Sequence, residues 1–126
     1  MDTDGLIHAG SGLDQVTWMD VRVGDWVATP RHGKPVEINA LWYNALCTMD
    51  MLQAKFNDND ESYRQLASLV KTSFNKRFWN ENTGCLYDVV DEDDDTIRPN
   101  QIYAVSLPFT MLDKERRKSN CRYGNG

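Results

Sequence analysis

Several signatures are missing from this chain of 126 residues, and each absence removes a class of protein. The first residues, MDTDGLIHAGSG, have neither the basic start nor the apolar core of a secretory signal peptide. No apolar run approaches the ~20 residues of a membrane-spanning helix. The net charge of −5 argues against a nucleic-acid or membrane-surface partner. We therefore expect a cytoplasmic protein with no membrane and no nucleic acid among its partners.

Motifs for cofactors and metals are missing as well. The chain has neither a Gly-rich phosphate loop nor a nucleophile elbow. His8 and His32 have no neighbour at ligand spacing. The acidic run from Asp91 to Asp95 lacks the spaced ligands, central Gly and closing Glu of an EF-hand, and it reads as a solvated turn. The sequence thus predicts no cofactor and no metal site.

Cysteine is scarce. Cys47, Cys85 and Cys121 are odd in number and widely separated, and no CxxC motif is present. This favours reduced thiols over a disulfide framework or a zinc site. Cys47 falls in the middle of an expected helix, where we expect a packed and inert thiol.

What the chain does have is a pair of helical patterns behind a long loop. Residues 1–34 are rich in Gly and Asp and are expected to form loops around an active site. Residues 35–56 and 60–79 predict a helical hairpin, with Pro35 and Glu37 suited to the first helical turn. The first apolar stripe, at spacings of four and three, comprises Ile38, Trp42, Ala45, Met49, Leu52 and Phe56. Ala40, Leu41 and Leu46 lie off it, so we expect this helix to be buried on more than one side. The second stripe comprises Tyr63, Leu66, Val70, Phe74 and Phe78. The polar turn between them, residues 57–60, predicts an N-cap for the second helix.

The rest of the chain is less regular. The segment CLYDVV, residues 85–90, is at most a short strand. Residues 99–112 predict a third helix that opens with Pro99, and Pro108 must kink it or end it early. Residues 113–126 form an atypical polar tail, whose basic residues read as a solvated helix end. We expect one all-α partial domain of about three helices plus active-site loops.

Aromatic and charged residues concentrate between Trp18 and Tyr43. Aromatic rings stack on the C–H face of a sugar, whereas carboxylates and amides bond its hydroxyls. A glycosidase also needs two carboxyl groups, one of them kept protonated as general acid by an apolar neighbour. Asp20, close to Trp18, fits that role, and Asp25 and Glu37 are the other nearby candidates.

These residues also have structural explanations. An aspartate in a Gly-containing loop is usually a turn or cap residue. Trp26 and Trp42 can belong to the core, and the helix dipole accounts for Glu37. Local chemistry therefore leaves both interpretations of Asp20 open.

Five blocks of sequence, in consistent order from Asp4 to Phe109, point to one known family. They read DGLIHAG, LDQVTWMD, TPRHGKPVEINALWYNAL, FWNENTGCLYDVVD and IRPNQIYAVSLPF. Together they resemble the C-terminal glucosidase domain of glycogen debranching enzymes, glycoside hydrolases of glycogen catabolism. The resemblance fades after Phe109.

The resemblance implies a fold and a reaction. The fold is an all-α toroid of six helical hairpins with the active site at one mouth. The reaction is hydrolysis of the single α-1,6-linked glucose at a branch of glycogen or limit dextrin, with inversion. Asp20 is implied as the general acid. The implied substrate-binding residues are Trp18, Arg31, Glu37, Asn39, Tyr43, Arg98 and Gln101.

The chain departs from this family in its length. Twelve helices of ~12 residues with their loops need more than ~200 residues, so about three helices read as a fragment of the toroid. Inversion needs a base carboxylate ~6.5–9.5 Å from the acid, and the resemblance implies that it lies beyond Gly126. The expected partners are then an α-glucan and the remainder of the toroid. Two alternatives stay open: a non-catalytic carbohydrate-binding or assembly module, and a vestigial product of a truncated or frameshifted gene.

Overall fold

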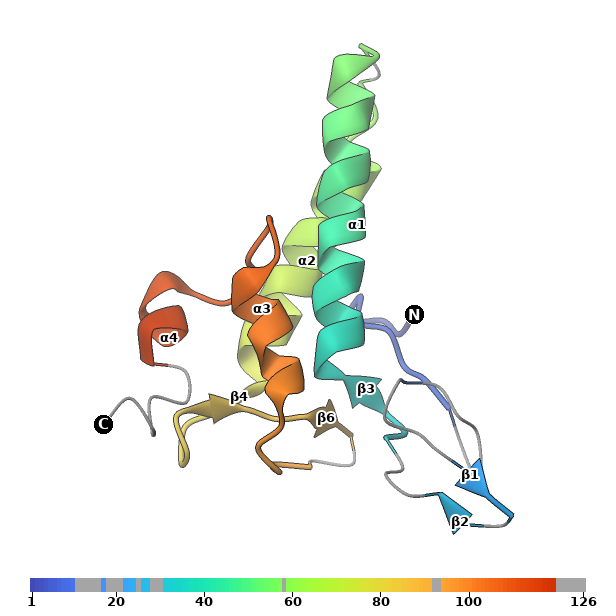
Figure 1. Ribbon diagram of the computed structural model, residues 1–126. Helices are drawn as coiled ribbons and strands as arrows, with labels where there is room; N and C mark the ends of the chain where they lie inside the picture. Colours follow the sequence, from blue (N-terminus) through green and yellow to red (C-terminus); the bar gives the residue numbers. More distant parts are fainter. Residues whose placement is uncertain are drawn as a thin grey trace.

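The computed structural model describes residues 1–10, 17, 22–24, 26–27, 31–57, 59–91 and 94–119, and helices dominate them (Figure 1). The helices are α1 (Val36–Lys55), α2 (Ser62–Arg77), the 3-10 helix η1 (Pro99–Ile102), α3 (Tyr103–Ser106) and α4 (Lys114–Ser119). The strands, two residues each, are β1 (Arg22–Val23), β2 (Trp26–Val27), β3 (Lys34–Pro35), β4 (Trp79–Asn80), β5 (Cys85–Leu86) and β6 (Val89–Val90). They form three antiparallel pairs, β1–β2, β3–β6 and β4–β5. The expectation of an all-α chain is confirmed in part, because helices predominate and the short strands are minor, and the toroid stays a prediction.

The two long helices, α1 and α2, form the expected antiparallel hairpin (Figure 1). The stripe predicted for α2 faces the core: Val70, Phe74 and Phe78 are buried, and the two phenylalanine rings stack 4.5 Å apart. The N-cap expected within residues 57–60 is wrong, because α2 begins after Glu61, which makes no side-chain cap hydrogen bond. Asp60 Oδ1 nevertheless accepts a hydrogen bond from Ser62 N at 2.8 Å. The hairpin is thus correct in its elements and in the face of α2.

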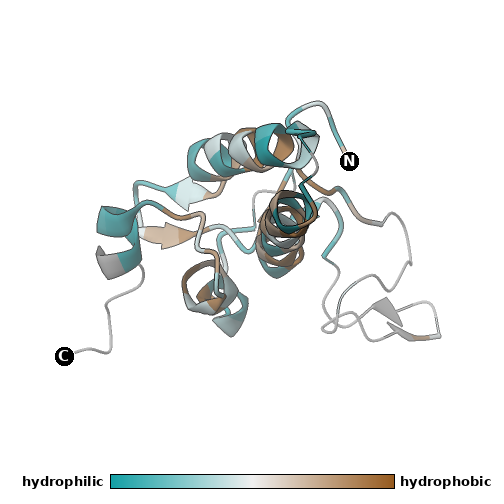
Figure 2. Ribbon diagram, turned by 90° about the horizontal axis from the view of Figure 1, so that it is seen from above, coloured by the Kyte–Doolittle hydropathy of each residue, from teal (hydrophilic) through white to brown (hydrophobic). Residues whose placement is uncertain are grey.

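The face predicted for α1 is wrong over most of its length. Among the residues expected to be buried, Met49, Leu52 and Phe56 are exposed, Phe56 at 77%. The side of α1 that meets the core carries Val36, Glu37, Asn39, Ala40 and Leu46. Figure 2 looks along α1 and shows brown, hydrophobic residues around this helix. Because several sides are apolar, the spacing alone did not identify the side that its neighbours cover.

The N-terminal segment packs across the hairpin. Leu6 is fully buried. Trp42 Nε1 on α1 donates a hydrogen bond to Gly5 O at 2.9 Å, and Ser73 Oγ on α2 donates one to Asp4 O at 2.7 Å. The expected loop of residues 1–34 therefore begins as part of the core.

The third helical segment, η1 followed by α3, ends at Ser106 and does not reach residue 112. Leu107 is extended, with ψ 156°, as the residue before a proline prefers. Pro108 has no N–H to continue the helix. The predicted early end is therefore confirmed, and the boundary at 112 is wrong.

Two asparagines hold the chain that follows. Asn44 on α1 donates from Nδ2 to Phe109 O at 2.7 Å and accepts from Phe109 N at 2.8 Å. Asn75 on α2 donates from Nδ2 to Met111 O at 2.6 Å and accepts from Asp113 N at 3.1 Å. Each amide thus pairs with the backbone as a strand would, and the segment is fixed to both long helices.

The C-terminal region differs from the expected tail. Residues 114–119 form α4, whereas residues 120–126 lie outside the described part. Arg116 of α4 lies over the ring of Trp79 at 5.2 Å and donates from Nη1 to Asn75 O at 2.7 Å. The basic residues of the expected tail are therefore not all solvated, because Arg116 packs on the hairpin.

The cysteines correct a further expectation. Cys85 in β5 is disulfide-bonded, whereas Cys47 in α1 is a free thiol. The expectation of three reduced thiols is therefore wrong at Cys85, because an odd count does not prevent one pair from forming. Cys47 packs against the core as expected, and burial raises the pKa of its thiol.

Candidate functional site

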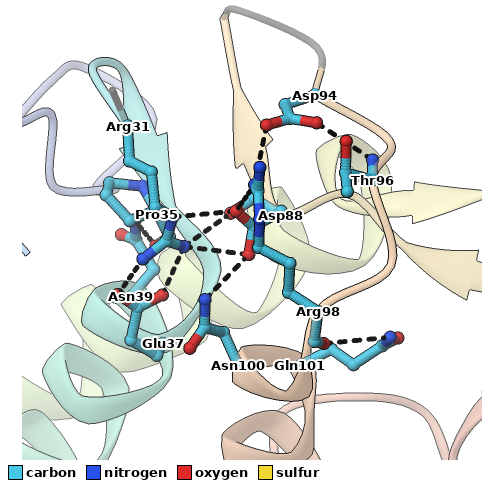
Figure 3. A network of polar contacts seen from close by, with 10 residues as sticks. All are labelled: Arg31, Pro35, Glu37, Asn39, Asp88, Asp94, Thr96, Arg98, Asn100 and Gln101. Carbon is cyan, nitrogen blue, oxygen red and sulfur yellow. Dashed lines mark hydrogen bonds and ion pairs between the residues drawn. The ribbon is translucent and has the colours of Figure 1, made fainter. Parts of the chain in front are cut away.

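Polar side chains from segments far apart in sequence meet at the N-terminal end of α1 (Figure 3). The pairing of β3 with β6 brings residues 34–35 beside residues 89–90. Val36 N, at the start of α1, donates to Asp88 O at 2.9 Å. Helix η1 also contacts α1. The backbone thus gathers the turn before β3, the first turn of α1, the β5–β6 connection and η1 in one place.

Arg31 lies at the centre of this cluster and is fully buried. Its guanidinium meets the Glu37 carboxylate with two nitrogens, Nη2 lying 2.7 Å from Oε2. It meets Asp88 with Nε at 2.8 Å from Oδ2 and Nη2 at 3.0 Å from Oδ1. Burial alone would lower the pKa of Arg31, but the two carboxylates raise it above its ordinary value. The cluster therefore holds a permanent buried cation between two acids.

Asp88 is the residue that the sequence interpretation missed. Besides Arg31, its carboxylate accepts hydrogen bonds from Arg98 Nη1 and, at 3.1 Å, from Asn100 Nδ2. The side chain is only 2% exposed. A signal was present, because an acid inside the apolar segment CLYDVV is stable only with partners.

Arg98 lies at the rim of the cluster, with 19% of its side chain exposed. Its Nη1 donates to Asp88 and, at 2.8 Å, to Asp94 Oδ2. Burial would lower the pKa of Arg98, but both carboxylates raise it. No described residue accepts a hydrogen bond from its Nε or Nη2. Within the described part of the chain, Arg98 thus retains a donor edge that no acceptor meets.

Asp94 belongs to the acidic run that was expected to be a solvated turn. Burial would raise the pKa of Asp94, but hydrogen bonds from Thr96 and Arg98 hold it below its ordinary value. Asp91 of the same run pairs with Lys34 at 3.5 Å and with Arg77 at 2.8 Å. Asp94 therefore braces Arg98, whereas Asp91 links β3 to the end of α2, and neither acid is simply solvated.

Asn39 and Gln101 both form hydrogen bonds with backbone groups. Asn39 is fully buried; its Oδ1 accepts from Ile7 N at 2.7 Å, and its Nδ2 donates to Ile7 O at 3.1 Å and Pro35 O at 2.9 Å. Gln101 Oε1 accepts from Leu86 N at 3.3 Å. Asn39 therefore ties the N-terminal segment to α1, and Gln101 ties η1 to β5.

Tyr43 lies further along α1, partly buried against the core. Burial, with a hydrogen bond to Cys47, raises the pKa of its phenol to about 12. No hydrogen bond among the described residues joins Tyr43 to the cluster around Arg31.

The expected general acid falls outside the described residues, as do Trp18 and Asp25. The assignment of Asp20 therefore stays a prediction. The third candidate acid is occupied, because both oxygens of Glu37 bond to Arg31. Neither oxygen is available to pass a proton to a glycosidic bond.

A described pocket lies elsewhere, at the other end of the hairpin. It is a cavity of about 340 Å³, lined by Asp50, Gln53, Ala54, Asn57, Asn59, Asp60, Glu61 and Arg64. Because α1 has 20 residues and rises ~1.5 Å per residue, this cavity lies far from the cluster around Arg31. None of the predicted site residues lines it.

No group of three or more His, Cys, Asp or Glu side chains within the described ranges could hold a metal ion. Over the same part of the chain, no helix has both the length and the apolar character needed to cross a bilayer.

Comparison with known proteins tests the resemblance. A family model described as amylo-alpha-1,6-glucosidase matches residues 1–122. No curated protein matches the chain. The family match confirms the resemblance seen in the five sequence blocks and extends it past Phe109.

Proposed function

Since the chain belongs to the amylo-alpha-1,6-glucosidase family, we propose that it provides the general acid and part of the sugar-binding pocket of a glucosidase active site. The substrate is the single α-1,6-linked glucose at a branch of glycogen or limit dextrin, and hydrolysis proceeds with inversion. The observation that carries the proposal is the family match over residues 1–122.

The proposed roles follow the chemistry of each side chain. Asp20 protonates the glycosidic oxygen, and Trp18 stacks on the sugar and keeps the acid in apolar surroundings. Arg98 donates hydrogen bonds to glucose hydroxyls from its open edge. Gln101 and Tyr43 complete the wall of the glucose-binding pocket. The buried residues Arg31, Glu37 and Asn39 lie behind this wall and fix the positions of the residues that form it.

The cluster geometry supports this arrangement. Arg31 and Glu37 belong to one sequence block and Arg98 to another, and the three share one hydrogen-bonded cluster with Asp88. Fixed donors of this kind bind a small polar ligand with little loss of side-chain entropy. A set of unrelated surface residues would not converge in this way.

The second catalytic carboxylate is a separate matter. Within the described cluster, Glu37 and Asp88 bond to Arg31, and Asp94 bonds to Arg98. None of the three is free to activate a water molecule. We propose that the base lies outside these 126 residues, and that the chain by itself binds glucan without hydrolysing it. This second function, a carbohydrate-binding module, is favoured by the occupied carboxylates.

Titration of the ¹⁵N-labelled chain with isomaltose, combined with a glucose-release assay on limit dextrin, tests both functions. We expect saturable binding that is lost in Trp18→Ala and retained in Asp20→Asn, with no glucose released. Trp79→Phe is the matched aromatic control, because Trp79 lies against Arg116 and the hydrophobic core. Turnover that Asp20→Asn abolishes would refute the binding module, and a folded chain without affinity for isomaltose would refute both.

A further inference from the structure

We infer that Asp88 is the positioning residue of this site: it orients Arg98 so that the open guanidinium edge faces the bound sugar. The inference rests on the proposed function and adds a residue that neither the sequence pattern nor the family match singles out.

Asp88 is unsuited to touch a ligand itself. Oδ2 accepts from Arg31 Nε and Arg98 Nη1, and Oδ1 accepts from Arg31 Nη2 and Asn100 Nδ2. A carboxylate offers about four acceptor positions, so no position remains for a sugar hydroxyl. With 2% exposure, the side chain can act only through its neighbours.

Arg98 is the neighbour through which it acts. The two hydrogens of Nη1 go to Asp88 and Asp94, which leaves the Nε and Nη2 hydrogens along the other edge. That edge is a rigid fork that matches two adjacent oxygens, as vicinal hydroxyls of glucose provide. Asp94 is 26% exposed, so the firmer of the two anchors is the buried Asp88.

The rest of the Asp88 environment separates positioning from folding. Its backbone accepts from Val36 N at 2.9 Å and donates to Asp94 O at 2.8 Å. An asparagine would keep both of these bonds. It would, however, bring an NH₂ group against arginine donors and remove the charge that orients them. Asp88→Asn is therefore expected to disturb Arg98 more than the backbone.

The test is the isomaltose titration of the full 126-residue chain, followed by ¹H–¹⁵N spectra that include the arginine Nε–H signals. We expect the Arg98 Nε–H signal to shift on titration in the wild type, and Asp88→Asn to weaken affinity about tenfold or more. In an Arg98→Met background, Asp88→Asn should change affinity less than about twofold, because the two residues act as one unit. Val70→Ala, a buried change on α2, controls for loss of stability alone.

The outcomes separate the two proposals. A wild-type chain that binds no isomaltose overturns the proposed function, and this inference with it. Binding that Asp88→Asn leaves unchanged, or effects of Asp88→Asn and Arg98→Met that simply add, overturn only the positioning role. If Asp88→Asn does not fold, Asn100→Ala replaces it, since it removes one of the two hydrogen bonds to Oδ1 and leaves the ion pairs with Arg31 and Arg98. Unchanged affinity in Asn100→Ala, with an unmoved Arg98 signal, would then overturn the inference.

Discussion

Replacing Arg31 by methionine tests the buried ion-pair cluster most directly. The guanidinium joins Glu37 and Asp88, whose side chains are 3% and 2% exposed. Without it, Asp88 keeps Arg98 and Asn100, but Glu37 has no other hydrogen-bond donor among the described residues. Removing one partner of a buried pair costs about 3–5 kcal/mol, because the remaining charge stays buried. Against a total stability of about 5–15 kcal/mol, this is a large fraction.

The assay is urea unfolding at pH 7 followed by far-UV circular dichroism. With a slope of about 1–3 kcal/mol per molar urea, the midpoint of Arg31→Met should fall by more than about 1 M. The matched control is Arg64→Met, which breaks a pair with Asp50 that is 3.3 Å long and on the surface. That change should stay within about 0.5 kcal/mol of the wild type.

A double variant sharpens the reasoning. Arg31→Met combined with Glu37→Leu should recover part of the lost stability, because no stranded carboxylate remains at position 37. Two results would refute this reasoning. In the first, Arg31→Met has the same urea midpoint as Arg64→Met, and in the second, the double variant is less stable than Arg31→Met. Either would show that pairing of buried charges is not how the cluster stabilises the fold.

Further predictions concern stability away from the cluster. Asp4 pairs with Lys34 at 2.9 Å; burial would raise the pKa of Asp4, but the hydrogen bond from Lys34 holds it below its ordinary value. Its stabilisation is therefore present above about pH 4 and lost as the pH falls further, and Asp4→Asn should flatten the dependence of urea midpoint on pH between about 5 and 2. Asn75→Ala removes two hydrogen bonds to the 111–113 backbone, so we expect a loss of about 1–3 kcal/mol and faster proteolysis there. Gly5→Ala should cost about 1 kcal/mol or more by thermal melting, because φ is +84° and the new Cβ would lie 3.1 Å from Val70 Cγ2.

The two long helices show what spacing can and cannot predict. The residues of α2 that lie off its stripe are mostly polar, so the stripe through Val70 and Phe74 had to face the core. In α1 the stripe through Met49 and Leu52 is equally regular, yet these residues are exposed. Periodicity gives the pattern of one helix, whereas burial depends on which neighbours are present.

The candidate site was predictable where residues lie close together in sequence. Glu37 and Arg31 are six residues apart and belong to one matching block. Asp88 lies 57 residues from Arg31, and the β3–β6 pairing brings the two together. A two-residue pairing leaves no periodic signal in the sequence, so no spacing argument could have found this contact.

The asparagine contacts on the two long helices have a consequence for how this chain can evolve. Asn44 and Asn75 lie on different helices, and their side chains form hydrogen bonds with the backbone of Phe109 and of residues 111–113. Because these hydrogen bonds involve only the backbone, the segment tolerates almost any side chain. The number of residues between the two hydrogen-bonded positions, however, is fixed. Substitutions there should be neutral far more often than insertions or deletions. A single added residue would leave one asparagine facing the wrong peptide group. Related sequences should therefore differ here in amino-acid identity and not in the number of residues.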